Sequence, residues 1–307
     1  MRIAIIGAGA LGSLFGGVLT RGGHDVWLYN PSNKKHIHAI QKNGLRIQTG
    51  DGDFEVKPNA TTRLAEIPLP IEVMGIFVKA YDTERAISDA LPLISTETWT
   101  LSLQNGIGPE VVLAQHVLNG RLLRGVTAQG ATLIEAGIVR WGGRGPTQLG
   151  LFGTKSGQLD DSLENLCATL SSADWKTHFT PEIEKDLWVK LLVNAAINPL
   201  TALFNVPNGQ LIADKELNAI LHGIIREALP VTRTHGVQLS LEEAISHVEG
   251  VCRGTAQNLS SMLQDVRRGK RTEIEYINGV VAREAKALDA QTPLNSLLTR
   301  LVMRSPY

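Results

Sequence analysis

A glycine-rich turn near the start of the chain constrains the fold more than any other feature. Residues 2–6, Arg-Ile-Ala-Ile-Ile, form a short apolar run typical of a strand buried on both faces. Gly7-Ala8-Gly9-Ala10-Leu11-Gly12 follows at once, and apolar residues at helical spacing come next. The first glycine permits a tight bend, the second lets the backbone approach a pyrophosphate, and the third lets helix and strand pack closely. Because the start of a helix attracts phosphates, this pattern predicts a dinucleotide-binding domain.

The next apolar run bears on which dinucleotide is bound. Residues 25–29 are expected to form a second strand, at whose end a carboxylate would hold the ribose 2′-hydroxyl of NAD. Asn30 stands there instead, and Lys34 and Lys35 follow within reach of a 2′-phosphate. This arrangement favours NADP over NAD. The alternative is that both lysines belong only to the solvated start of a helix.

Two further strands deliver polar residues to the edge of the sheet where α/β folds bind ligands. The strand expected at residues 72–78 leads into Lys79, and the strand at 98–103 leads into Asn105. Asn105 is therefore a candidate cleft residue, although Asn-Gly is also a common turn sequence. Between the strands expected at residues 25–29 and 72–78, apolar and polar residues alternate on both sides of a Gly-Asp-Gly turn, which predicts a hairpin at residues 45–56.

The pattern changes after Gly125, where short apolar stretches alternate with glycines. They fit antiparallel strands added to the sheet better than further strand–helix units. Thr180-Pro181 then supplies residue types typical of an N-cap and a first helical position, so we place the domain boundary between residues 180 and 181. The expected elements are strands at 126–128, 131–134, 138–141 and 148–152, a helix at 159–170 and a strand at 175–179.

Everything after residue 180 has helical patterning, including an amphipathic segment at 215–235. Ser240 and Thr272 each precede a glutamate three residues later, which predicts two capping boxes. The predicted fold is therefore an α/β Rossmann-type N-terminal domain with added antiparallel strands, residues 1–180, and an all-α C-terminal domain, residues 181–307.

The helix expected at residues 187–198 is apolar on nearly every side except for Lys190, Asn194 and Asn198. These three residues are four apart, so they lie in one stripe. A helix that is apolar all round is normally buried, and a buried charge must have partners. The stripe is either a cleft wall with one proton donor and two amides, or a polar stripe satisfied inside the protein.

The two predicted domains together favour hydride transfer in the crevice between them. The chain shows no Ser-His-Asp or Cys-His arrangement and no cluster of metal ligands. A reductase must supply a proton to the carbonyl oxygen that becomes an alkoxide. Lys190 can do this, because desolvation lowers the pKa of a lysine and its charge stabilises an oxyanion.

Composition excludes several other classes. Thirty basic and thirty acidic residues balance, which gives no indication of a nucleic-acid partner. Cys167 and Cys252 match no metal or redox spacing and are expected to be reduced packing thiols in a cytoplasmic protein. His36 and His38 are expected in a solvated stretch, and no apolar run is expected to be long enough to span a bilayer.

Longer motifs make the chain resemble the ketopantoate reductase family (2-dehydropantoate 2-reductases) along essentially its whole length. Together these motifs are far more specific than a nucleotide fingerprint. They are Leu187-Trp188-x-Lys190-Leu-x-Val-Asn194-x-x-Ile-Asn198-Pro-Leu-Thr-Ala, Pro207-Asn208-Gly209, Ser260-Ser261-Met262-Leu263-Gln264-Asp265 and Thr272-Glu273-Ile-x-Tyr276-Ile-Asn278-Gly279.

The resemblance implies NADPH-dependent reduction of 2-dehydropantoate to (R)-pantoate, in the pantothenate and coenzyme A pathway. Lys190 would be the general acid, Ser261 a donor to the substrate carboxylate, and Glu273 an acidic contact to cofactor or substrate. Glu273 on its own would instead be explained by the start of a helix. The other implied contacts are the substrate-binding amides Asn105, Asn194, Asn198 and Asn208, and the cofactor contacts Gly7–Gly12, Asn30, Lys79, Asn105 and Ala131.

One departure concerns the cofactor. Some members carry an arginine after the second strand for the 2′-phosphate, whereas Asn30 stands near that place here, so Lys79 with Lys34 or Lys35 would have to replace it. Alternative functions are reduction of another 2-oxo acid, a 3-hydroxyacid dehydrogenase, and a catalytically silent NADP-binding sensor. A homodimer is left open.

Overall fold

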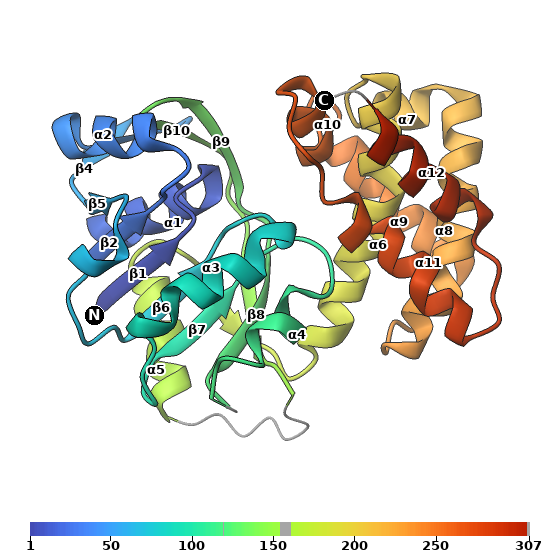
Figure 1. The fold of residues 1–307 in the computed structure, drawn as a ribbon. Coiled ribbons are helices and arrows are strands. Elements are labelled where there is room, and N and C mark those ends of the chain that lie inside the picture. Colours follow the sequence, from blue (N-terminus) through green and yellow to red (C-terminus); the bar gives the residue numbers. More distant parts are fainter. Residues whose placement is uncertain (119, 154–160, 306–307) are drawn as a thin grey trace. The chain divides into compact units, whose positions relative to one another are not determined.

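The computed structural model describes residues 1–118, 120–153 and 161–305. The chain divides into two compact units. The first consists of Met1–Gln104 and Gly108–Ile183, and the second of Asn105–Ile107 and the residues from Glu184 onward. The first is an α/β unit built on a mostly parallel sheet and the second is helical (Figure 1), so the predicted fold class is confirmed.

Within the described residues, the main sheet of the first unit has eight strands in the order β12-β11-β8-β7-β6-β1-β2-β5. β1 pairs in parallel with β2 on one side and with β6 on the other, so the strand order reverses beside β1. Ligands bind at such a reversal in open α/β sheets. The strands are β1 (Arg2–Ile6), β2 (Asp25–Tyr29), β5 (Asn59–Thr61), β6 (Val73–Ile76), β7 (Trp99–Ser102), β8 (Leu122–Thr127), β11 (Thr147–Leu151) and β12 (Thr177–Phe179).

A second sheet corrects one prediction. The hairpin predicted at residues 45–56 is present as β3 (Leu45–Gln48) and β4 (Phe54–Val56). The strands β9 (Gly130–Glu135) and β10 (Ile138–Gly143) do not join the main sheet as expected, because β10 pairs in parallel with β3. β11 is an antiparallel addition to the main sheet, beside β8, which itself runs parallel to β7, and β12 pairs in parallel with β11.

Helix α1 (Ala10–Arg21) explains why this second sheet forms, because it has an apolar face on each side. A Cβ at Gly16 would lie 2.5 Å from Leu28 of the main sheet, and a Cβ at Gly17 would lie 2.6 Å from Ile47 of the second sheet. The two glycines thus let both sheets pack closely on α1, and the second sheet covers a face that would otherwise meet water.

One of the remaining helices of the first unit corrects a second prediction, that of a solvated His36. His36, in α2, is fully buried rather than solvated. Its Nε2 lies 2.9 Å from the Ser13 hydroxyl and its Nδ1 accepts the Gly137 N–H at 3.0 Å, while burial lowers its pKa to about 4. The helices are α2 (Lys34–Asn43), η1 (Leu64–Glu66), η2 (Ala80–Asp82), α3 (Thr83–Ala90), η3 (Leu91–Leu93), α4 (Pro109–Leu113) and α5 (Asp161–Ser172); residues 159 and 160 of the helix predicted at 159–170 lie outside the described residues.

The second unit packs its helices around α6 (Ile183–Phe204), whose apolar residues belong to one buried core. The capping box predicted at Ser240 is present, with Glu243 as its partner. The cap predicted at Thr272 is wrong, because no side chain among the described residues caps η4 (Ile274–Tyr276). Helix α6 begins three residues after Thr180, whose hydroxyl accepts the Glu182 N–H at 3.1 Å. The other helices are α7 (Gln210–Ala213), α8 (Lys215–Thr234), α9 (Leu241–Gly254), α10 (Ser261–Arg267), α11 (Asn278–Ala287) and α12 (Pro293–Arg304).

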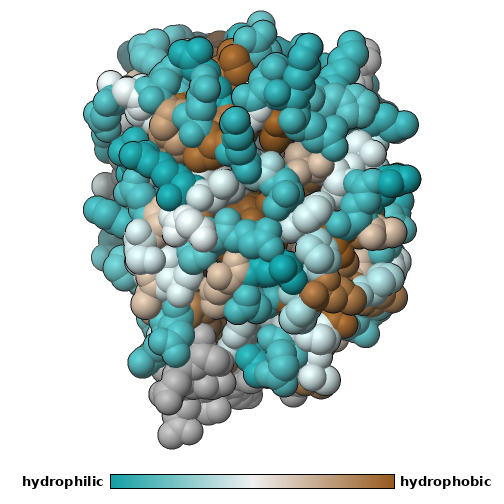
Figure 2. Space-filling view, turned by 90° about the vertical axis from the view of Figure 1, so that its left-hand side faces the viewer, coloured by the Kyte–Doolittle hydropathy of each residue, from teal (hydrophilic) through white to brown (hydrophobic). Residues whose placement is uncertain are grey.

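Helix α6 also has the length and apolar composition of a membrane-spanning helix, contrary to the expectation from the sequence. However, 67% of its most apolar window is buried, as in the central helix of a packed core. The face of the molecule in Figure 2 is mostly hydrophilic, and apolar residues form several small groups on it.

Candidate functional site

The glycine-rich turn after β1 has the geometry that a bound pyrophosphate requires. Gly7 has a φ of +101°, and a Cβ there would lie 2.6 Å from the Val78 backbone nitrogen. A Cβ at Gly12 would lie 2.4 Å from the Gly7 carbonyl oxygen, so only glycine lets α1 pack against the turn. A Cβ at Gly9, by contrast, would meet no atom within 4 Å among the described residues. The turn is therefore closed on the protein side and open at Gly9, where a phosphate could approach.

The start of α1 is also suited to an anion. No described side chain caps this helix and its first turn, which includes Ala10 and Leu11, holds no acidic residue. The N–H groups of Gly7 and Ala8 are directed elsewhere, to the Tyr29 carbonyl at 3.0 and 3.1 Å. Free N–H groups and the positive end of the helix dipole fit a pyrophosphate, so these residues fit a dinucleotide.

Asn30 plays a structural part that the sequence did not indicate. Its Nδ2 donates to the Ala8 carbonyl at 3.1 Å, and its Oδ1 accepts the N–H groups of Ser32 and Asn33 at 3.1 and 3.0 Å. The side chain thus ties the glycine-rich turn to the loop after β2. Lys34 and Lys35, at the start of α2, are exposed.

The ends of β6 and β7 are tied together by Gln104, a residue to which the sequence analysis gave no role. Its Nε2 donates to the Val78 carbonyl at 2.9 Å and to the Thr83 hydroxyl at 2.8 Å. Lys79 follows β6 in this region and is half-buried, and Ala131 lies half-buried in β9. The cofactor residues predicted from the sequence, apart from Asn105 and Glu273, therefore belong to the first unit.

Asn105 directly follows Gln104 but belongs to the helical unit. The Ile107 N–H donates to the Tyr276 carbonyl at 3.0 Å. Gly106 has a φ of +84°, and a Cβ there would lie 2.4 Å from the same carbonyl oxygen. Glycine is required at 106 because this short segment passes so close to η4, and the contact fixes Asn105 relative to the helical unit.

The stripe on α6 combines polar side chains with a perturbed lysine. Lys190 and Asn194 are half-buried and Asn198 is 5% exposed, while Leu191 and Ala195, which follow the first two, are buried in the core. Burial lowers the pKa of Lys190 from 10.5 to about 8, and the opposing effect of the Glu273 carboxylate keeps it from falling further. A lysine with this pKa can both donate a proton and recover it near neutral pH.

Glu273 is a buried carboxylate, 6% exposed, at the residue before η4. It makes no capping hydrogen bond there, so the start of a helix does not account for it. The neighbouring Thr272 hydroxyl is also buried and has no hydrogen-bond partner among the described residues. The Glu273 carboxylate and the Lys190 ammonium lie on separate elements of the helical unit and act on each other electrostatically.

Asn208 and Ser261 differ in how they are held. The Asn208 Nδ2 donates to the Thr255 hydroxyl at 2.9 Å, whereas its Oδ1 is buried and has no partner among the described residues. Ser261 is the exposed first residue of α10, and the N-cap of that helix is Ser260, whose hydroxyl accepts the Leu263 N–H. The residues that the helical unit holds are Asn105, Lys190, Asn194, Asn198, Asn208, Ser261 and Glu273.

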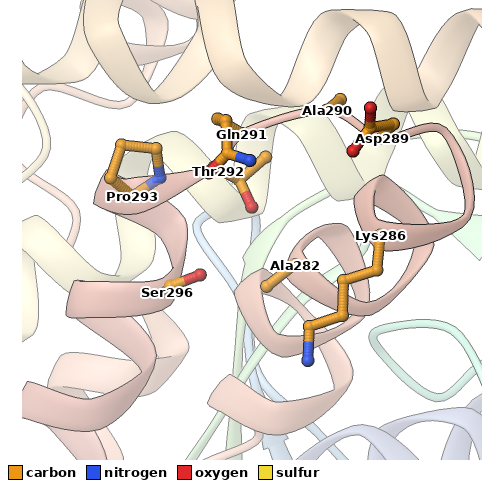
Figure 3. Close-up of a pocket in the computed structure, with 8 residues that line it drawn as sticks. All are labelled: Ala282, Lys286, Asp289, Ala290, Gln291, Thr292, Pro293 and Ser296. Atoms are coloured by element: carbon orange, nitrogen blue, oxygen red, sulfur yellow. The ribbon is translucent and has the colours of Figure 1, made fainter.

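A separate hollow of about 310 Å³ lies at the turn between α11 and α12 (Figure 3). None of the predicted site residues lines it. Lys286, Asp289 and Thr292 are among the residues at its wall. The Leu294 and Asn295 N–H groups at the nearby start of α12 already donate to Glu227, at 2.9 Å each. Within the described residues, no group of three or more histidine, cysteine or acidic side chains could hold a metal.

Comparisons with known proteins agree over both units. Residues 3–170 match the family model described as ketopantoate reductase PanE/ApbA, and residues 182–305 match the model of its C-terminal part. The 2-dehydropantoate 2-reductase of Pyrococcus horikoshii is 37% identical over 302 residues, which cover 98% of this chain and 96% of that protein.

Two solved structures are also similar. One is D-mandelate dehydrogenase with NADH and anilino(oxo)acetate, with a TM-score of 0.91 and 30% identity over 98% of this chain and 97% of that one. The other is a PanE/ApbA family ketopantoate reductase from Ralstonia eutropha, with a TM-score of 0.88 and 30% identity over the same shares. The glycine-rich turn, the lysine stripe and these matches together show that the chain belongs to the ketopantoate reductase family, a family of oxidoreductases.

Proposed function

We propose that the protein reduces 2-dehydropantoate to (R)-pantoate with NADPH, and that Lys190 protonates the ketone oxygen. The observation that supports this proposal most directly is the pKa of Lys190, about 8, held there by burial and by Glu273. A fully solvated lysine would be a weaker acid.

In this mechanism the helical unit binds the 2-oxo acid and supplies the proton. A reduced nicotinamide bound by the first unit would supply the hydride to the carbonyl carbon. The Lys190 ammonium donates a hydrogen bond to the ketone oxygen, stabilises the negative charge that develops there, and transfers its proton. Asn194, Asn198 and Asn208 orient the substrate through hydrogen bonds without adding charge, and Ser261 donates to its carboxylate.

The preference for NADPH is part of the proposal. Lys34 and Lys35 are exposed at the start of α2 and would pair with the 2′-phosphate, together with Lys79. Asn30 leaves no carboxylate at the end of β2 to repel that phosphate. The proposal also places the protein in the cytoplasm, acting on a small molecule. Whether it forms a homodimer is left open.

A second candidate is a dehydrogenase of another D-2-hydroxy acid. D-Mandelate dehydrogenase is as similar to this chain as the Ralstonia reductase is, by sequence identity and share covered, and its structure holds NADH. The corresponding 2-oxo acid carries an aromatic ring where 2-dehydropantoate carries a branched hydroxyalkyl chain. The two functions therefore differ in the side chain of the substrate and in the cofactor, and share the proton transfer.

The test is the rate of oxidation of NADPH and of NADH with 2-dehydropantoate, beside the 2-oxo acid of mandelate and beside Lys190→Ala. We expect rapid turnover of 2-dehydropantoate with NADPH that is lost in the variant. Faster turnover of the aromatic acid with NADH would favour the second candidate. Tight NADPH binding without turnover of any 2-oxo acid would refute both and leave a nucleotide sensor.

A further inference from the structure

Helix α6 lacks one of its own hydrogen bonds in the middle of the polar stripe. In an α-helix the N–H of each residue donates to the carbonyl four residues earlier. Pro199 lies inside α6 and has no N–H, so the Ala195 carbonyl loses its helical donor. Ala195 is fully buried, so water cannot replace that donor. A buried carbonyl without a partner is costly, and another group must satisfy it.

Asn278 supplies the missing donor. Its Nδ2 lies 2.9 Å from the Ala195 carbonyl oxygen, although the two residues are 83 apart in sequence. The second hydrogen of the same amide is used as well, because Nδ2 lies 3.0 Å from the Asn295 Oδ1. Both asparagines are fully buried. The first residue of α11 thus takes the place of the donor that Pro199 lacks.

The orientation of this amide is determined by its surroundings. The Glu227 carboxylate on α8 offers acceptors, and Asn295 turns its Nδ2 toward it, at 2.9 Å. Asn295 then presents its Oδ1 to Asn278. A rotated Asn278 amide would place its own oxygen against two acceptors, the Asn295 Oδ1 and the Ala195 carbonyl. The chain of contacts therefore fixes the donor that faces α6.

The interrupted turn lies between the predicted site residues. Ala195 directly follows Asn194, and Pro199 directly follows Asn198. Lys190 and Asn194 are on one side of the interruption, and beyond Pro199 the Thr201 hydroxyl lies 3.0 Å from the Asn198 carbonyl oxygen and 2.6 Å from the Ser260 hydroxyl. A proline inside a helix bends it. The direction in which Asn198 points relative to Lys190 therefore depends on this turn.

We propose that Asn278 is a positioning residue for the reaction: by satisfying the carbonyl that Pro199 frees, it fixes Asn198 relative to Lys190 and Asn194 for binding of the 2-oxo acid. This inference rests on the proposed function. Asn278 itself does not touch the substrate in this proposal, because it is fully buried and its two amide hydrogens are used inside the helical unit.

The test uses Asn278→Leu, Pro199→Ala and the double variant in the full-length protein. Asn278→Leu should lower the melting temperature by several degrees, because the Ala195 carbonyl loses its donor. It should also raise the KM for the 2-oxo acid about tenfold or more, since a small misplacement of binding groups is costly. The dissociation constant of NADPH, measured by titration, should change less than about twofold, because most of the predicted cofactor contacts, including the glycine-rich turn, are in the other unit.

The double variant separates positioning from stability. Ala at position 199 has an N–H that can donate to the Ala195 carbonyl, so we expect about half or more of the lost melting temperature to return. The KM should stay high, because the helix is then regular and Asn198 points elsewhere. A variant that regains both its melting temperature and the wild-type KM would show that Asn278 serves stability only, and would overturn the proposal.

Asn218→Leu is the matched control. Asn218 on α8 donates its amide at 3.1 Å to Glu249, which lies on α9 of the same unit. It should leave the KM unchanged. Absence of turnover in the wild-type protein with every 2-oxo acid would refute the proposed function itself. Turnover in the wild type with an unchanged KM in Asn278→Leu would refute only the positioning role.

Discussion

Raising the pH through about 8 should switch off reduction, because Lys190 loses its proton over that range. With a pKa of about 8, about nine tenths of the Lys190 side chains are protonated at pH 7 and about one tenth at pH 9. The kcat/KM for reduction should therefore fall about tenfold between these two pH values and continue to fall above them. A lysine with the ordinary value of 10.5 would give a flat profile over the same range.

Glu273→Gln sharpens this prediction. The carboxylate raises the pKa of Lys190, so its removal should move the break in the profile to lower pH. The assay is the initial rate of NADPH oxidation across the pH range, and the position of the break is compared rather than the rate, since Glu273 is also a predicted contact.

Glu275→Gln is the control, because this carboxylate lies two residues further along and pairs with Arg271 at 2.7 Å. The break in the pH profile of Glu275→Gln should lie at the same pH as that of the wild type. A wild-type profile that stays flat to pH 10, or a break that moves equally in both variants, would refute the assignment of Lys190 as the acid.

Lys190→Ala should lower kcat by about two to four orders of magnitude at an unchanged fold, measured with saturating NADPH, and a loss of less than tenfold would reject it as the general acid. Gly9→Val should keep the melting temperature, since a Cβ there meets no described atom within 4 Å, but raise the dissociation constant of NADPH about tenfold or more; Gly12→Val should instead lose the fold, because its Cβ would lie 2.4 Å from a carbonyl oxygen. Burial lowers the pKa of His36 to about 4, so as the pH falls from about 6.5 to 4 the unfolded chain takes up a proton at this residue and the folded chain does not, which lowers the free energy of unfolding. In denaturant titrations across this window, the free energy of unfolding of His36→Gln should fall by up to about 3 kcal/mol less than that of the wild type. Equal losses in the two proteins would contradict the burial of the neutral ring.

Local patterns were sufficient for much of the fold. The glycine-rich turn and its flanking strand and helix follow from residues that are neighbours in sequence, and the stripe on α6 follows from helical spacing alone. The second sheet could not be predicted in this way. Its parallel pairing joins β3 and β10, which are far apart in the chain, and it forms because α1 has a second apolar face to cover.

Two site features were missed for related reasons. The stretch with His36 looked solvated because lysines precede it, yet α2 turns that side chain inward to Ser13 and Gly137. Pro199 did give a signal, since a proline in a helical pattern always leaves one carbonyl without its donor. The identity of the replacement donor, Asn278, depends on how helices pack, and no spacing in the sequence reveals it.

The segment at Asn105–Ile107 has a consequence for building hybrid enzymes. A chimera made by joining two family members near residue 183 would exchange most of the helical unit but leave this segment with the wrong parent. The Ile107–Tyr276 hydrogen bond joins two backbones, so it does not depend on which side chains the parents carry. Position 106 is demanding, because a Cβ there would collide with the Tyr276 carbonyl. Hybrids that keep glycine at that position should therefore retain the join, and exchanged helical units could be used to change substrate choice without altering the nucleotide site.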